Sequence, residues 1–303
     1  MWVVFALLSR FLWSGGGMLD QVLSRAHTRH RVLSVLTLQM CTYLPFSLMA
    51  CYLSGHVHWS GTLFLWAAGA LTAYTVAMLP YYKALLAEQS YNIVPYFELT
   101  PVFLTIFVLT LRHEHMSSVQ LAAALLVISC GFAFSWDFKH GKVKVKILAL
   151  MCLSAIIFAM QQFCIKSASV AEDAWTVTFY YTLGQSLIGW LMFAVFRPGR
   201  KEIIRACKAT SGKTVLFACS SGGFSFLAFA SLTYAFKIAP STGHVAALSG
   251  TQPLFSFFLA AILGHRIPQH FETFVLDWEL KLKLLFILGI VCGIYILTRY
   301  NGS

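Results

Sequence analysis

Apolar residues fill the chain in runs of about twenty, separated by short polar turns. A helix of that length, rising about 1.5 Å per residue, crosses a hydrocarbon core about 30 Å thick. The runs lie at 2–23, 33–54, 60–82, 91–111, 117–136, 145–167, 174–196, 214–236, 241–263 and 282–298. Turn residues such as Ser54-Gly55 and Pro198-Gly199 separate them. This pattern predicts an all-α, polytopic membrane protein with ten transmembrane helices, and the short connections make consecutive helices antiparallel.

The chain also resembles itself at an offset of 152 residues. Between 82–114 and 234–266 the aligned identities are Tyr82/Tyr234, Ala87/Ala239, Pro101/Pro253, Phe103/Phe255, Leu111/Leu263 and His113/His265. Each block ends one span, turns, and enters a span with a mid-helix proline. Five spans per copy is an odd number, so the second copy starts from the opposite side, as in many secondary transporters. We expect two inverted five-helix repeats, residues 1–140 and 141–303, with a cavity between them near the midplane.

Composition supports lipid as the main solvent. The chain is 58% hydrophobic and 11% charged, with a mean hydropathy of +0.73, whereas a soluble domain has about 25% charged residues. The eight cysteines form no C-x-x-C pair, and most lie inside apolar runs, so they indicate neither a disulfide framework nor a zinc site. The first 25 residues lack a basic leading region, and Arg10 interrupts the apolar run, so we expect no signal peptide.

The net charge is +11. The basic residues that produce it lie between the apolar runs, where we expect them to contact lipid headgroups rather than nucleic acid. We name the side holding residue 1 side A and the other side B. Of 22 Lys and Arg residues, 17 fall on connections of side B and four, Lys166 among them, on side A. The longest polar stretch, 197–213, is interpreted as a side B loop. The positive-inside rule then places side B in the cytoplasm and both termini outside a cell (inner or plasma) membrane.

Several short motifs resemble those of a known family. They are Leu12-Trp13-Ser14, Tyr81-Tyr82-Lys83-Ala84, Pro101-Val102-Phe103, Glu114, Gly131, Tyr234-Ala235, Gln252-Pro253-Leu254-Phe255 and Gly293. Together the chain resembles EamA-type transporters of the drug/metabolite transporter superfamily over nearly its whole length. The resemblance implies a carrier of metabolites or amphiphilic compounds, with termini usually inside, against the charge count. This chain departs from the family at His265-Arg266, where the pattern has a glutamate, and in an insertion that follows, Pro268 to Leu280.

Charges inside spans are costly and therefore informative. Arg10 lies about eight residues into the first run, roughly 12 Å deep, and Glu98 about seven residues into the fourth. Two long side chains can close the remaining gap of roughly 8 Å between their levels. We expect Arg10 and Glu98 to line the central cavity as a pair, or to form a structural contact only.

Uncharged polar residues complete the candidate site. Gln161, His244 and Gln252 are the best candidates for the cavity, and Tyr96 is one of several tyrosines suited to line a path for an organic solute. Other buried glutamines, such as Gln39, are expected to make hydrogen bonds between helices.

Alternatives remain open. A non-transporting membrane subunit or scaffold has the same fold class. An intramembrane hydrolase needs a nucleophile and base, for which Ser220-Ser221-Gly222 and His244 are candidates, but nothing marks an oxyanion hole, and we assign no catalytic residue. Two H-x-H pairs, His56/His58 and His113/His115, are weak metal candidates, so no metal or other cofactor is expected. The expected partners are a small-molecule solute, the lipid bilayer and protons as a candidate coupling ion, with the chain a monomer or homodimer.

Overall fold

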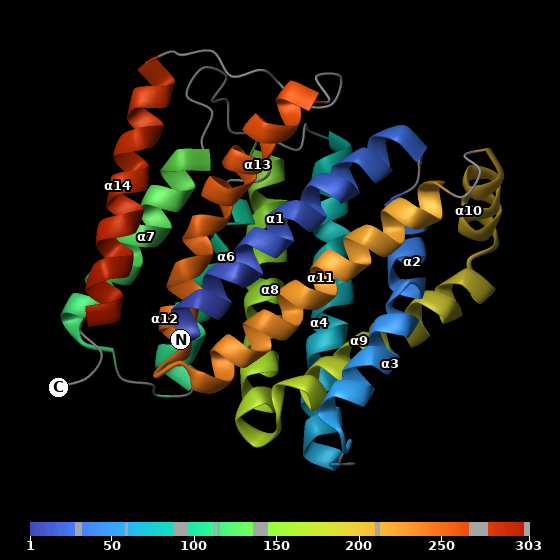
Figure 1. The fold of residues 1–303 in the computed structure, drawn as a ribbon, viewed down its shortest axis with the longest axis horizontal. Coiled ribbons are helices and arrows are strands. Elements are labelled where there is room, and N and C mark those ends of the chain that lie inside the picture. Colours follow the sequence, from blue (N-terminus) through green and yellow to red (C-terminus); the bar gives the residue numbers. More distant parts are fainter. Residues whose placement is uncertain are drawn as a thin grey trace.

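The computed structural model describes residues 1–27, 32–57, 60–87, 96–97, 99–111, 113, 116–135, 145–209, 213–266 and 278–299. Throughout these residues the regular structure is helical, with no strand (Figure 1). The helices of the first half are α1 (Trp2–His27), α2 (Val32–Cys41), α3 (Tyr43–Ser54), α4 (Gly61–Ala87), α6 (Leu99–Leu111) and α7 (Ser118–Ser135). Those of the second half are α8 (Val145–Ala171), α9 (Ala174–Val195), α10 (Arg197–Ala209), α11 (Lys213–Ile238), α12 (Thr242–Ala247), η2 (Leu248–Thr251), α13 (Gln252–Arg266) and α14 (Trp278–Arg299).

Five described stretches are long and apolar enough to cross a membrane. They are Trp2–Leu19, Leu36–Ser54, Gly61–Tyr81, Val145–Ala171 and Val215–Ile238. A sixth arises if α9 and α10, which meet at 97°, are taken as one bent span. Shorter apolar helices lie at Leu99–Leu111, Ser118–Ala133 and Leu284–Leu297.

The distribution of side chains is that of a membrane-embedded bundle. Large apolar residues such as Leu48, Leu65 and Leu288 are more than 60% exposed on the outer surface. Arg10 and Lys166, in contrast, are 2% and 6% exposed in the interior. In water, such an outer surface would be an aggregation site, whereas lipid is its natural solvent.

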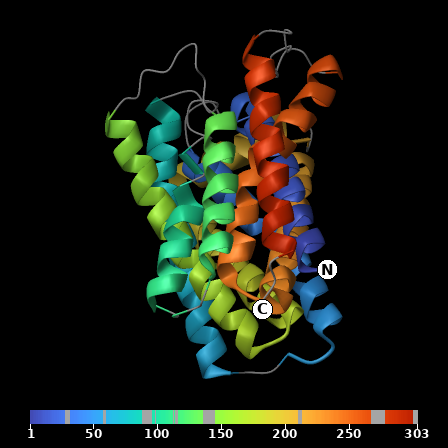
Figure 2. The ribbon, with the colours of Figure 1, turned by 90° about the vertical axis from the view of Figure 1, so that its left-hand side faces the viewer.

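Small residues bring the helices close together. A Cβ on Gly16 of α1 would lie 3.4 Å from Ser225 Oγ of α11, and one on Gly289 of α14 would lie 2.5 Å from Cys130 Sγ of α7. α1 packs along α11, α4 along α8, and α7 along α14, and the last pair lies side by side at one edge (Figures 1 and 2). The absence of a side chain at these glycines permits this close packing, which drives helix association in lipid.

The second predicted span is broken into α2 and α3 at Thr42. The Thr42 hydroxyl donates to the Gln39 carbonyl at 2.7 Å, so the side chain satisfies a backbone acceptor at the break. Two glycines of neighbouring helices pack against this break. A Cβ on Gly189 of α9 would lie 2.6 Å from Cys41 N, and one on Gly222 of α11 would lie 2.8 Å from Thr42 Oγ1.

The prediction of mid-helix prolines is wrong. Pro101 stands in the first turn of α6 and Pro253 in the first turn of α13, where a missing N–H costs nothing. In the second half the run 241–263 is therefore three pieces, α12, the buried 3₁₀ turn η2, and α13. Gly250 of this turn packs backbone against backbone on Gly131 of α7, because a Cβ on Gly131 would lie 2.4 Å from the Gly250 carbonyl oxygen.

The interpretation of 197–213 as a loop is also wrong, since most of it is α10. Ile203 on one face is buried against Leu38 of α2 and Ala218 of α11, and this apolar contact stabilises the helix. Cys207 lies on the same face, and desolvation raises the pKa of its thiol. At the bend a Cβ on Gly199 would lie 2.3 Å from the Phe196 ring, which explains why glycine follows Pro198 here.

Candidate functional site

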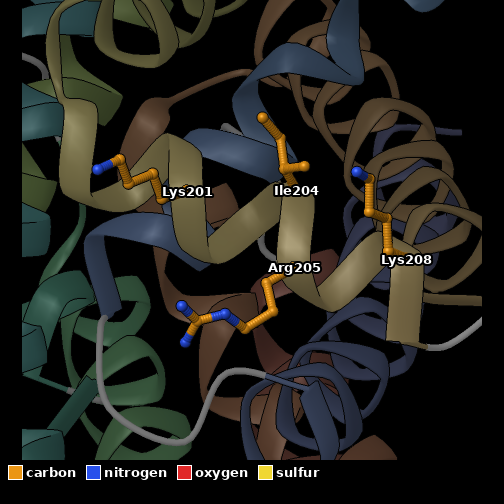
Figure 3. A pocket seen from close by; sticks show the side chains of 4 residues that line it. All are labelled: Lys201, Ile204, Arg205 and Lys208. Atoms are coloured by element: carbon orange, nitrogen blue, oxygen red, sulfur yellow. The ribbon is translucent and has the colours of Figure 1, made fainter.

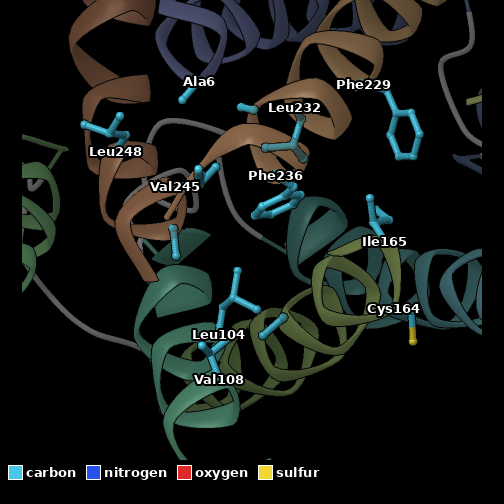
Figure 4. Close-up of a cluster of buried hydrophobic side chains, with 14 of the residues drawn as sticks. Ala6, Leu104, Val108, Cys164, Ile165, Phe229, Leu232, Phe236, Val245 and Leu248 are labelled. Carbon is cyan, nitrogen blue, oxygen red and sulfur yellow. The ribbon is translucent and has the colours of Figure 1, made fainter. Parts of the chain in front are cut away.

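The largest buried cluster draws residues from both halves of the chain. Its members, some of which Figure 4 shows, include Trp2 and Ala6 of α1, Ala70 of α4, Leu104 and Val108 of α6, Cys164 and Ile165 of α8, Tyr181 of α9, Phe229, Leu232 and Phe236 of α11, and Val245 of α12. Most of these residues come from the ends of their helices that lie on the side where α1 begins, side A. This cluster therefore joins the two halves of the chain in the part of the bundle toward side A.

Arg10 lies in the interior of the bundle, on α1. Its guanidinium carbon is 4.9 Å from the centroid of the Trp13 ring, a cation–π contact within the helix. One turn further, Ser14 Oγ lies 2.9 Å from the Arg10 carbonyl and 3.1 Å from the Gln252 carbonyl, and it accepts a hydrogen bond from Ser256 Oγ at 3.1 Å. The predicted site residues Arg10 and Gln252 are therefore joined through Ser14, which the sequence motifs contain but did not single out.

Gln161 of α8 forms a second polar group. Its side-chain amide donates to the hydroxyl of Tyr181, and that ring stacks on Phe229 with centroids 4.1 Å apart and planes 2° apart. Tyr74 of α4 meets the Tyr181 ring edge-on at 6.3 Å. The structure thus places Gln161 where α4, α8, α9 and α11 meet.

His244 of α12 is 2% exposed. Its Nδ1 lies 2.9 Å from Ser241 Oγ, just before the helix, and its ring meets Trp2 of α1 edge-on at 5.7 Å. His244 therefore connects the start of α12 to the start of α1, since it contacts Ser241 on one side and Trp2 on the other.

Tyr96 is buried away from these residues. It packs with Ala84 of α4 and with Ile147 and Met151 of α8, in a separate cluster. Glu98 lies outside the described residues, so its predicted pairing with Arg10 stays a prediction.

Lys166 is the functional candidate that sequence reasoning missed. The count of charges assigned it to a connection, but α8 continues to Ala171 and buries it. Its ammonium donates to the Phe236 carbonyl at 2.5 Å. That carbonyl belongs to the last turn of α11, where the helix offers acceptors without internal partners and carries partial negative charge. The position of Lys166 one residue before the end of a predicted apolar run was the only available signal.

The other candidates have local partners. Gln39 donates to Ser221 Oγ at 3.2 Å, which confirms the expected hydrogen bond between helices. Within the described residues, which include His56 and His113 but not His58 or His115, no group of three His, Cys, Asp or Glu is placed to hold a metal ion.

Comparisons with known proteins address the fold. No protein-family model matches the sequence, and no curated protein matches it. Among solved structures, the chain is similar to a crystal structure described only as that of a protein, with a TM-score of 0.68 and 16% identity. The match covers 98% of each chain, so the whole arrangement of helices is a fold found in another protein.

Proposed function

We propose that this chain is a secondary transporter that moves a small metabolite or amphiphilic compound across the cell membrane by alternating access. The observation that carries the proposal is Arg10, which is 2% exposed inside a bundle whose outer surface is apolar. A buried charge at this depth costs several kcal/mol unless a partner, water or a solute compensates it. Membrane proteins retain such groups where ions or polar solutes pass.

The proposal includes ten spans arranged as two inverted repeats, and the helix boundaries support it. Shifted by 152 residues, α4 covers 213–239, and α11 is Lys213–Ile238. The same shift takes α6 to 251–263, and α13 is Gln252–Arg266. Pro101 and Pro253 fall in the first turn of each. Two segments with the same length, spacing and proline position are what a duplicated unit produces.

The broken span α12–η2–α13 is a second support. Discontinuous helices near the midplane are typical of transporter binding sites, because the free backbone groups at the break interact with solutes or ions. Thr251 and Ser249 turn their hydroxyls back onto carbonyls within the break, at Leu248 and Ala246. Irregular backbone is tolerated at membrane depth only where it is buried in protein or lines water.

The buried guanidinium suggests the class of solute. A solute with a carboxylate or phosphate group would compete for Arg10, and protonation of Glu98 would release it in the same way. Either event would favour one access state over the other. We therefore propose an anionic or zwitterionic solute, with protons as the candidate coupling ion.

Side B is proposed to face the cytoplasm. With Lys166 buried in α8, three of the four basic residues assigned to side A remain on its connections, against 17 on side B. The excess of Lys and Arg on side B is therefore larger than the sequence count gave. Because cytoplasmic loops carry this excess, the larger difference favours side B as the cytoplasmic side.

Flux into proteoliposomes tests the proposal. Purified protein is reconstituted and assayed with a panel of anionic and zwitterionic metabolites, with and without a proton gradient. We expect saturable uptake of an unchanged solute, weakened or uncoupled in Glu98→Gln. Arg10→Ala should lose expression and flux, with partial recovery when Glu98→Gln is added, whereas Arg299→Ala, at an exposed position, should behave as wild type.

Each other outcome has a meaning. Solute that is chemically altered would indicate an enzyme. No flux of any solute by a folded protein would favour a scaffold. Normal flux with normal pH dependence in Glu98→Gln would reduce Arg10 and Glu98 to a structural contact.

A further inference from the structure

α10 stands apart from the rest of the bundle in charge and direction. It leaves α9 at 97° and lies at the edge of the molecule opposite α14 (Figure 1). Its 13 residues carry five basic side chains, Arg197, Arg200, Lys201, Arg205 and Lys208, against one acid, Glu202. The proposed transport mechanism uses none of them.

One face of α10 is anchored to the bundle. Ile203 is buried against α2 and α11, and Ser34 Oγ of α2 donates to Glu202 Oε2 at 2.8 Å. Arg200 reaches back to the Ala194 carbonyl near the end of α9 at 3.4 Å, where a cation is favoured. Ser34 lies two residues after the start of α2, and the Ala218 contact lies five residues after the start of α11. α10 therefore packs beside the bundle close to the ends of its neighbours, where we infer the membrane interface.

The opposite face is basic and exposed. Lys201, Arg205 and Lys208 recur at intervals of four and three residues, so they share one side of the helix. Together with Ile204, which is 42% exposed, they line an open groove (Figure 3). Three cations on one open face attract an anionic group, and an exposed isoleucine among them suits an acyl chain better than water.

We propose that the groove formed by Lys201, Ile204, Arg205 and Lys208 binds the headgroup of an anionic phospholipid in the side B leaflet. The basic side chains hold the phosphate, their aliphatic stems lie along the acyl chain, and Ile204 contacts its first methylenes. The occupant is a lipid rather than a soluble anion because α10 lies beside the bundle at the interface and exposes an apolar side chain within the groove. The bound lipid would hold α10 against the bundle at the α9 bend.

A matched pair of double variants tests the site. Lys201→Gln/Lys208→Gln removes two charges from the groove. Lys83→Gln/Lys146→Gln removes two exposed charges from the same side of the membrane, on α4 and α8. Each purified protein in detergent is titrated with phosphatidylglycerol or phosphatidylcholine, and bound lipids are counted by native mass spectrometry.

We expect wild type to prefer phosphatidylglycerol. The groove variant should bind its first phosphatidylglycerol about 25-fold more weakly, since each lysine near a phosphate contributes about fivefold. The control variant should bind as wild type does. Lys201→Arg/Lys208→Arg keeps the charge and should keep the preference, which separates lost binding from a damaged fold.

Three results would overturn the proposal. Equal affinity for phosphatidylglycerol and phosphatidylcholine would show that the groove does not recognise an anionic headgroup. An equal loss in the Lys83→Gln/Lys146→Gln protein shows diffuse attraction rather than a site. Displacement of the lipid by an equal concentration of glycerol phosphate, which has no acyl chains, identifies the groove as a site for free phosphates.

Discussion

α4 and α11 are the same kind of helix in two different surroundings. They have 27 and 26 residues and begin 152 positions apart. α4 packs along α8 and α9, and α11 packs in the corresponding way along α1 and the α2–α3 pair. α11 also packs on α8 and α9 of its own half, whereas no comparable packing of α4 on α1, α2 or α3 occurs among the described residues.

A few side chains create this difference. Phe229 stacks on Tyr181 of α9, and the Phe236 carbonyl accepts from Lys166 of α8. At the equivalent positions of α4, 152 residues earlier, stand Ala77 and Ala84. The Phe229 ring in place of an alanine lets α11 contact α9 at the side A end, whereas the bond from Lys166 uses a backbone carbonyl that an alanine would also offer. Two helices of similar length can therefore differ in their packing through a few side chains.

The largest effect is expected for Phe229→Ala, which makes α11 resemble α4. Truncating a buried phenyl ring costs about 3–5 kcal/mol, and here it also frees Tyr181. We expect a lower thermal midpoint in detergent and faster hydrogen exchange at the amides of 229–238. Phe226→Ala is the control, because that ring stacks on Phe46 of α3 and meets Trp175 of α9 at 6.4 Å, in a buried cluster separate from that of Tyr181. It should lower the midpoint similarly but leave this exchange unchanged; equal exchange in both variants would contradict a special role for Phe229.

Gly131→Ala tests a contact between the two halves, the 3₁₀ turn η2 packed on α7. A Cβ there would lie 2.4 Å from the Gly250 carbonyl oxygen, so two backbones must separate. We expect a loss of about 1–3 kcal/mol. Gly17→Ala on α1 meets nothing within 4 Å, and its better helix propensity should leave the thermal midpoint unchanged or raised. A Gly131→Ala protein as stable as wild type would show that the backbones at Gly131 and Gly250 can separate without loss of stability.

Lys166→Met removes the hydrogen bond that joins α8 to the end of α11. The apolar substitute relieves the cost of burying a charge but leaves the Phe236 carbonyl without its donor, so we expect a net loss of about 1 kcal/mol. Hydrogen exchange should rise in the last turn of α11. Lys237→Met is the control: this exposed lysine donates to the Glu172 carbonyl at 3.3 Å, and its loss should cost less than about 0.5 kcal/mol. A larger loss of stability in Lys237→Met than in Lys166→Met would contradict a stabilising role for the bond between Lys166 and the Phe236 carbonyl.

Ser154→Ala is expected to have the smallest effect. Ser154 Oγ of α8 donates to the Ala77 carbonyl of α4 at 2.9 Å, in the pairing that has a counterpart in α1 and α11. Hydrogen bonds between membrane helices contribute about 0.6 kcal/mol on average. The thermal midpoint should fall slightly with exchange at 229–238 unchanged. A larger loss than in Lys166→Met would mean that the shared interface, not the closure at side A, dominates stability.

Several features could be predicted from residue order because they depend on local chemistry. Apolar runs became helices, since only helices satisfy their own backbone groups in lipid. Gln39 predicted a hydrogen bond between helices, because a polar side chain in an apolar run needs a partner. Arg10, Gln161 and His244 were selected because polar groups are costly in apolar runs, and all three are buried.

Other features depended on neighbours distant in sequence. α10 has an amphipathic pattern, but its low hydrophobicity suggested a loop until α2 and α11 supplied a surface for Ile203. Lys166 resembled an ordinary residue at the end of a span. Its burial depends on the end of α11, about seventy residues away in the chain, where a helix terminus offers a carbonyl.

The sequence by itself determined the apolar solvent, the helices and the similar lengths of α4 and α11, because hydrophobicity and helical hydrogen bonding act within about twenty neighbouring residues. Only the tertiary structure decided which helices touch, where spans break and which end of the bundle closes. Those outcomes rest on the fit between surfaces, such as Phe229 on Tyr181 or Gly131 on Gly250, and a change of one methyl group or one ring alters that fit.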